Sequence, residues 1–271
     1  MLTNVMFALA QSKEASSENI CFFDEEVHKK KEFENFIESN MQQALDSQCF
    51  EMVLQPKMNL QTNSVIAAEA LVRWRLEDGT YLPPSSFVDI FEKNRFCSKL
   101  DFYMLKKAIQ QIRKWIDMGI NPVNISVNQS KIVFYHENYI SELKSLLEEY
   151  NVSGSYITLE VLESTVIEDI DIFNSILTEV KKLGFSVSLD DFGSGYSSLN
   201  VLSKLQIDEL KIDRIFLHTK SEVDNQRTKW ILESIIDIAK KSQILVVVEG
   251  VESKQDDLFI RLNRYIGDLL I

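Results

Sequence analysis

The stretch FSVSLDDFGSGYSSL, residues 185–199, ends an apolar run with two adjacent carboxylates, Asp190 and Asp191. On a regular strand, neighbouring side chains point to opposite faces, so one of these acids should face away from any shared pocket. A Gly-Ser-Gly turn follows directly, and Gly193 and Gly195 can adopt backbone angles that other residues rarely take. We therefore expect the strand to end at the two acids, so that the turning backbone brings both carboxylates to one pocket.

Strand-like and helix-like segments alternate on both sides of this stretch. Apolar and β-branched runs predict strands, the last of them only begun, at 50–56, 64–74, 123–128, 156–161, 185–191, 208–212, 244–250 and 267–271. Periodic apolar residues predict helices at 33–45, 100–116, 139–150, 172–184, 228–241 and 256–264. This alternation indicates parallel strands with helical crossovers, and so many units suit a (β/α)8 TIM-type barrel. A doubly wound sheet fits the sequence less well, because no glycine-rich phosphate loop follows the first predicted strand.

The composition limits the partners. A formal net charge of −12 argues against a polynucleotide, because phosphate backbones are bound by clustered lysine and arginine. No apolar stretch approaches the roughly 20 residues that cross a bilayer, and no signal-peptide pattern opens the chain, so no membrane segment is expected in it. Three well-separated cysteines, Cys21, Cys49 and Cys97, favour reduced thiols in a cytoplasmic protein.

Polar residues gather where the predicted strands end, and in a barrel of this kind that edge carries the catalytic groups. They are Glu69, Asn128, Glu160, Glu163, Asp190, Asp191, Lys211, Glu249 and Glu252. Taken singly, each has a plain structural interpretation as a solvated strand residue, a turn cap or a surface ion pair. Taken together, so many carboxylates in apolar strands require cations. Oxygen ligands favour Mg²⁺ or Mn²⁺, and two such ions side by side suit metal-dependent hydrolysis of a phosphoester.

Six motifs in order carry a resemblance to the EAL-domain cyclic di-GMP phosphodiesterases: EALVRW, SVNQS, LEVLES, SLDDFGSGYSSL, DELKID and VVEGVES. The resemblance covers about 33–271. It implies a TIM-type barrel that cuts cyclic di-GMP to linear pGpG with Mg²⁺ or Mn²⁺, in bacterial second-messenger signalling. It also implies a homodimer formed through the helix after the DDFGSGYSS loop.

The resemblance also implies a role for each residue. Ligands of the first metal would be Glu69, Asn128, Glu160 and Asp190, with Asp190 bridging to a second metal that Asp191 helps to hold. Lys211 and Glu249 would position and activate the attacking water. Glu163 would brace the DDFGSGYSS loop, with Glu252 as a second support. Substrate-binding residues would be Gln55, Leu71 and Arg73, the arginine gripping a phosphate.

The two ends of the chain depart from this pattern. Residues 1–32 are expected to be a linker or the tail of a preceding GGDEF-like domain without cyclase activity, and 33–271 a C-terminally truncated EAL domain. The chain stops at YIGDLLI, where the family continues with a glutamine-glycine motif. We therefore expect an incomplete last strand and helix, with open sheet edges beside it. Within the motifs, Leu162 stands where the family more often has threonine.

Three hypotheses follow. The first is an active phosphodiesterase, cytoplasmic and part of a longer protein that can be membrane-attached. The second is a catalytically impaired module that binds cyclic di-GMP or regulates a partner. The third is a truncated product that does not fold.

Overall fold

The computed structural model describes residues 24–163, 170–193, 202, 204–216, 222–251 and 269–270. The chain divides into two compact units. The first comprises Met1–Glu51 and Arg73–Asn94, and the second comprises Met52–Val72 and Arg95–Ile271. Among the described residues, no helix is both long enough and apolar enough to span a membrane.

The first unit is built around helix α2 (Glu25–Asp46), the ends of two long strands, and a short strand β3 (Tyr81–Leu82), turn η1 (Pro84–Ser86) and helix α3 (Val88–Lys93). Its core is aromatic: the rings of Phe50 and Trp74 lie 5.0 Å apart between centroids, and those of Phe87 and Phe91 lie 5.2 Å apart. Such ring pairs stabilise a small core beyond their buried area.

Helix α2 begins earlier than the sequence predicted. The carboxylate of Asp24 caps it by accepting hydrogen bonds from the backbone N–H groups of Glu26 (2.8 Å) and Val27 (3.3 Å). The i,i+4 pair of Lys29 with Glu25, at 2.8 Å, supports the first turns. The charged segment expected to be a linker is therefore helical from Glu25, while its assignment to a preceding domain stays a prediction. The weak helix considered at 4–13 lies outside the described residues.

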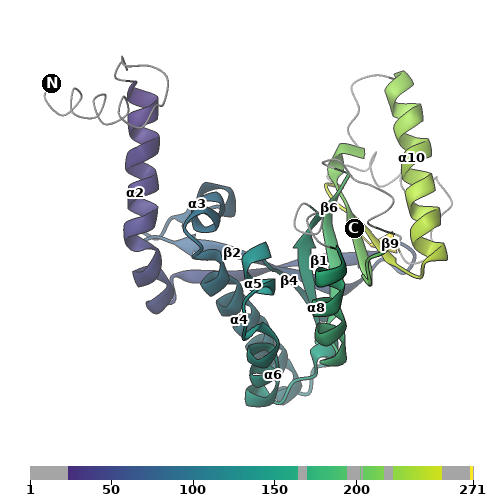
Figure 1. The fold of residues 1–271 in the computed structure, drawn as a ribbon, viewed down its shortest axis with the longest axis horizontal. Coiled ribbons are helices and arrows are strands. Elements are labelled where there is room, and N and C mark those ends of the chain that lie inside the picture. The colour runs from purple at the N-terminus through teal and green to yellow at the C-terminus, as the bar shows by residue number, and fades with distance from the viewer. Residues whose placement is uncertain are drawn as a thin grey trace, which may run out of the picture. The chain divides into compact units, whose positions relative to one another are not determined.

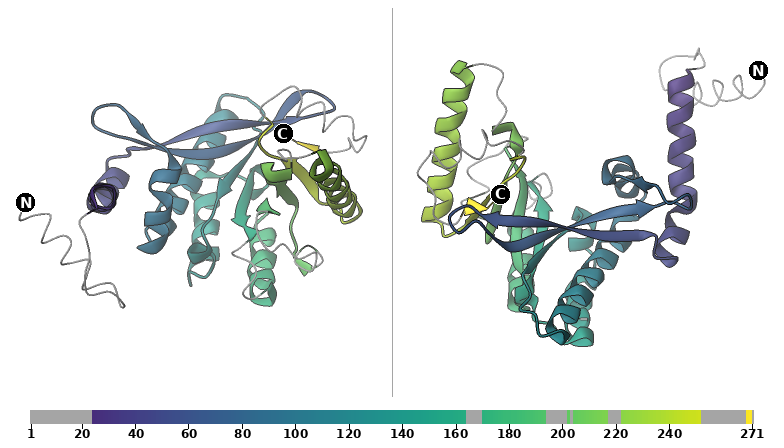
Figure 2. Two further views of the ribbon diagram at one scale, coloured as in Figure 1. Left: turned by 90° about the horizontal axis from the view of Figure 1, so that it is seen from above. Right: turned by 180° about the vertical axis from the view of Figure 1, so that it is seen from behind.

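The second unit contains a curved, mainly parallel sheet of the TIM-barrel type. Its strands are parts of β1 (Phe50–Asn59) and β2 (Ser64–Arg75), then β4 (Asn124–Asn128), β5 (Ile157–Leu162), β6 (Ser186–Phe192), β7 (Glu209–Ile212), β8 (Leu245–Val248) and β9 (Leu269–Leu270). Neighbouring strands from β2 through β4 to β9 pair in parallel, in chain order. Figure 2 shows β1 and β2 running side by side. Four residues join them, too few for the helical crossover that parallel neighbours need, so this pair departs from a uniform (β/α)8 pattern.

Helices connect the parallel strands and pack beside them (Figure 1). They are α4 (Cys97–Asp117), α5 (Lys131–Phe134), α6 (Tyr139–Tyr150), α8 (Ile170–Lys182) and α10 (Glu222–Lys241), with short turns η2 (Gly154–Tyr156) and η3 (Arg214–Phe216). α4 packs against β4, α8 against β6 and α10 against β8. In α4 the buried residues recur at helical spacing, for example Leu105, Ala108, Ile109 and Ile112, which is why this segment forms a helix with one apolar face.

The last strand is short, as expected, and among the described residues it meets β1 at a single pair of residues. β9 pairs with β8 on one side, and on the other Leu270 pairs with Asn59 of β1 in antiparallel orientation. Since β1 also pairs with β2, the strand pairings run around the whole sheet. The predicted helix at 256–264 lies outside the described residues.

Polar and apolar side chains alternate along the central strands. The apolar side chains on one face are fully buried; they include Val161, Leu189, Leu210 and Ile212. Between them stand buried polar residues on the other face of the strands, which are Ser126, Thr158, Glu160, Ser188, Asp190, Glu209 and Lys211. This inner polar face carries the candidate site.

Candidate metal and catalytic site

The paired acids share one site, as predicted, but they lie at a bulge within the strand and not at its end. Strand β6 continues through Phe192, and its register with β7 shifts between Leu189 and Phe192. Asp191 sits in this irregularity with a left-handed backbone, φ +56°. A bulge of this kind re-aims side chains that a regular strand would send to opposite faces.

Gly193 follows the bulge with φ +96°, as the sequence predicted for this turn. A Cβ atom there would lie 2.2 Å from Cε2 of Phe216, so only glycine fits without moving that ring. Gly195, the other glycine of the turn, lies outside the described residues.

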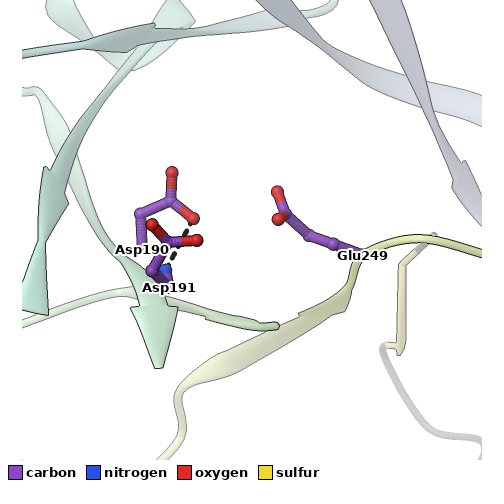
Figure 3. A group of neighbouring side chains, drawn as sticks. All are labelled: Asp190, Asp191 and Glu249. Atoms are coloured by element: carbon purple, nitrogen blue, oxygen red, sulfur yellow. Dashed lines mark hydrogen bonds between the residues drawn. The ribbon is translucent and has the colours of Figure 1, made fainter. Parts of the chain in front are cut away.

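Three carboxylates form the centre of the site. One oxygen each from Asp190, Asp191 and Glu249 lies within 4.8 Å of the others. Figure 3 shows Glu249, just after β8, facing the two aspartates of β6. Asp190 also accepts a hydrogen bond at Oδ1 from the backbone N–H of Asp191, at 2.8 Å, which holds its carboxylate in place.

Lys211 of β7 joins four acids from four strands or strand ends. Its Nζ lies 2.7 Å from Glu249, 2.9 Å from Glu160, 3.0 Å from Asp190 and 3.2 Å from Glu69. Burial alone would lower the pKa of this lysine, but the surrounding carboxylates outweigh it and raise the pKa, so the ammonium stays charged.

The carboxylates are not fully neutralised by this one cation. Burial, with the charges of Glu160 and Glu249, raises the pKa of Asp190 to about 7 despite the opposing effect of Lys211. Burial, then Glu249 and Asp213, raises the pKa of Asp191. Burial and Glu160 likewise raise the pKa of Glu69. Perturbed pKa values of this kind are typical of functional sites.

Asn128 and Glu69 complete the polar edge. Nδ2 of Asn128, the last residue of β4, donates to Oε1 of Glu69 on β2 at 3.2 Å. Asn128 also lies opposite Glu160 in the β4–β5 register. Five acids and one amide from five strands or strand ends, with Lys211 of β7 among them, thus meet at the edge that the sequence indicated.

The remaining predicted residues are less closely tied to this cluster. Glu163 is buried, and its Oε2 accepts a hydrogen bond from the backbone N–H of Gly193 at 3.4 Å. Gln55 is exposed on β1, and Leu71 is half-buried on β2. Arg73 lies on β2 in the first unit. Glu252 lies outside the described residues.

Two charged residues of the inner face were not predicted. Lys57 of β1 is buried, and its Nζ lies 2.8 Å from Glu160 and 2.8 Å from Glu209 of β7. Burial alone would lower the pKa of Lys57, but Glu160 and Glu209 raise it. No sequence signal short of the strand pairing joins residues that lie 103 and 152 positions apart.

The donor set fits a hard divalent cation. All side chains in question offer carboxylate or amide oxygen, which Mg²⁺ and Mn²⁺ prefer, and none offers the sulfur or imidazole nitrogen typical of zinc.

Known proteins resemble this chain over most of its length. A family model described as EAL domain matches residues 38–261. A Pseudomonas aeruginosa protein named cyclic di-GMP phosphodiesterase NbdA is 34% identical over 263 residues, 97% of this chain and 33% of the relative. The Escherichia coli protein named cyclic di-GMP phosphodiesterase PdeR is 30% identical over 257 residues, 94% of this chain and 38% of the relative. The chain thus spans between 33% and 38% of the length of these relatives.

Solved structures show the same fold. The PaMucR phosphodiesterase in complex with c-di-GMP has a TM-score of 0.78 and 30% identity, covering 87% of this chain and 94% of that one. An EAL domain protein from Listeria monocytogenes EGD-e has a TM-score of 0.72 and 26% identity, covering 86% and 90%.

Proposed function

The chain belongs to the EAL domain family, and from this premise we propose that it hydrolyses cyclic di-GMP to linear pGpG with the help of Mg²⁺ or Mn²⁺. The observation that carries the proposal is the convergence of Glu69, Glu160, Asp190 and Glu249 on Lys211. We infer the substrate from two relatives that are named cyclic di-GMP phosphodiesterase.

The metal ligands that we propose are those implied by the sequence. Glu69, Asn128, Glu160 and Asp190 would hold one cation, and Asp191 would share a second with Asp190. When bound, such cations lower the pKa of a water molecule and neutralise charge on the oxygens around phosphorus.

Lys211 and Glu249 act on the attacking water. The Glu249 carboxylate, 32% exposed, can reach solvent and accept a proton from the water as it attacks phosphorus. Lys211, 2.7 Å from Glu249, orients that carboxylate and offsets negative charge as it develops. The bond from phosphorus to the 3′ oxygen of one ribose breaks, and this oxygen takes a proton, which leaves pGpG with a 5′-phosphate.

Other parts of the chain serve binding and support. We assign Gln55, Leu71 and Arg73 to the substrate, with the planar guanidinium suited to a phosphate. Glu163 holds the loop through Gly193, which keeps Asp191 in position. Glu252 is assigned the second supporting role on its sequence motif.

The setting of the domain is proposed on the sequence alone. We assign it to the cytoplasm, within a longer signalling protein, and to a homodimer formed through the helix after the DDFGSGYSS loop. Residues 194–201 of that region lie outside the described residues. Sedimentation of the purified chain at several concentrations tests the dimer, and a single monomer peak throughout would contradict it.

Turnover is the test of the proposed function. Purified chain is mixed with cyclic di-GMP and Mn²⁺, and pGpG is separated by chromatography. Lys181→Met, which removes a part-exposed pair with Asp208 at 2.8 Å, is a matched control. We expect pGpG from the wild type and the control, and none from Glu69→Ala. Binding of cyclic di-GMP without product would refute hydrolysis and favour a binding module.

A further inference from the structure

Lys57 is a second buried lysine below the proposed metal site, and nothing in the proposed function uses it. It extends from β1, is 4% exposed, and contacts three strands across the sheet: β4, β5 and β7. We propose that Lys57 is a positioning residue, which fixes the carboxylate of Glu160 so that one oxygen of this acid is directed to the metal. The inference rests on the proposed function, because it concerns one of the proposed ligands.

The hydrogen bonds of the ammonium group are fully assigned. A lysine Nζ has three donors, and here three acceptors surround it: Ser126 Oγ at 2.7 Å, Glu160 Oε1 at 2.8 Å and Glu209 Oε1 at 2.8 Å. Three charge-assisted or polar contacts from three strands leave the group one orientation. The ammonium group of Lys57 is therefore held in one orientation and can in turn orient the carboxylate of Glu160.

Glu160 divides its two oxygens between the two lysines. Oε1 lies 2.8 Å from Lys57, and Oε2 lies 2.9 Å from Lys211. Because its side chain is buried with 0% exposure, no water can replace either contact at low cost. With Oε1 held by Lys57, Oε2 is the oxygen on the side of Glu69 and Asp190, where the proposed cation would bind.

Glu209 and Ser188 explain how the lysine is accommodated. Ser188 of β6 lies in register between Glu160 of β5 and Glu209 of β7. Its small side chain leaves both carboxylates accessible to one ammonium. Glu209 is two residues before Lys211, on the same face of β7, so a single short strand supplies both an anchor for Lys57 and the lysine of the site.

A purely structural role is the alternative, since buried ion pairs often exist without a functional contribution. The two roles differ in what they change. A structural pair changes the stability of folding, whereas a positioning residue changes the affinity for the metal in a protein that remains folded.

The test compares Mn²⁺ binding by calorimetry in the full chain and three variants, with melting temperatures measured in EDTA. Lys57→Met combined with Glu209→Gln removes both charges together, Glu209→Gln alone keeps Lys57, and Lys181→Met is the surface control. We expect the double variant to fold and to bind Mn²⁺ about tenfold more weakly, and the two single variants to bind within about threefold of wild type.

Each other outcome overturns the inference. A folded double variant with wild-type affinity for Mn²⁺ shows that Lys57 does not position Glu160. A double variant that fails to fold shows that Lys57 has a structural role. If Glu209→Gln alone lowers the affinity for Mn²⁺ as much as the double variant does, the effect belongs to Glu209. Failure of the wild type to bind Mn²⁺ is a separate result, which contradicts the proposed function itself.

Discussion

Asp190 and Asp191 are neighbours in the chain, yet their carboxylates meet within one group of acids whose oxygens lie within 4.8 Å. The left-handed backbone of Asp191, φ +56°, at a register shift of β6 makes this possible. A regular strand would have turned one of them away. The bulge is therefore the local feature that allows two aspartates to share the site.

The backbone and the charge of Asp191 can be tested separately. Asparagine tolerates the left-handed region better than alanine does, so Asp191→Asn should be more stable than Asp191→Ala by about 1 kcal/mol. Both variants lack the charge and should lose most turnover. Urea unfolding in EDTA measures the first difference. An Asp191→Ala protein as stable as Asp191→Asn would show that the bulge does not impose this backbone.

Asp190 should destabilise the metal-free protein at alkaline pH. Its pKa is raised from 3.8 to about 7, chiefly by burial, so between these values the folded state binds a proton that the unfolded state has lost. In EDTA, the free energy of unfolding should consequently fall as the pH rises from 4 to 7, by on the order of 1 kcal/mol per pH unit, and then level off.

Asp190→Asn removes this penalty. At pH 8 in EDTA the variant should melt higher than the wild type, while its affinity for Mn²⁺ should fall. Melting curves at pH 5 and pH 8 give the comparison, and the gain should shrink at pH 5. A variant that melts lower at pH 8 would contradict the assigned cost of the ionised carboxylate.

Lys211→Met should be strongly destabilising. It leaves Glu160 and Asp190 buried without the cation that lies 2.9 Å and 3.0 Å away, and breaking a buried pair in this way costs about 3–5 kcal/mol. Lys181→Met, at a part-exposed pair, should cost about 1 kcal/mol or less. Equal urea midpoints for the two variants would refute the central place of Lys211 among the acids.

Glu249→Gln should separate activity from stability. This side chain is 32% exposed, so the loss of its charge should change the free energy of unfolding little. Turnover should fall by about 10²–10⁴-fold, because the variant cannot accept the proton of the attacking water. Initial rates of pGpG formation and a urea curve provide both values. Near-normal turnover would remove Glu249 from the proposed reaction.

The sequence predicted the edge of the sheet at which the site lies, because acids, Asn128 and Lys211 end strands that are otherwise apolar. It could not predict the bulge, since whether β6 ends or bends depends on its register with β7. It also missed Lys57 with Glu209, whose contacts form only when distant strands pair. The early start of α2 was hidden by its charged composition, in which Asp24 is the cap.

The pairing of the last strand, β9, also depends on contacts between distant parts of the chain, which the sequence does not reveal. The motifs predict an open edge beside the last strand, whereas β9 pairs with β8 in parallel and meets β1 at one pair of residues. Pairing at a single register position, Asn59 with Leu270, depends on where the β1–β2 hairpin lies and not on any motif.

We propose that these acids form a metal site, and not only an ion-pair network around Lys211. Anomalous X-ray diffraction from crystals grown with Mn²⁺ tests it most directly. We predict one manganese peak among Glu69, Asn128, Glu160 and Asp190, and a second beside Asp190 and Asp191. Diffraction without a manganese peak there, with Lys211 still contacting its four carboxylates, would contradict the account.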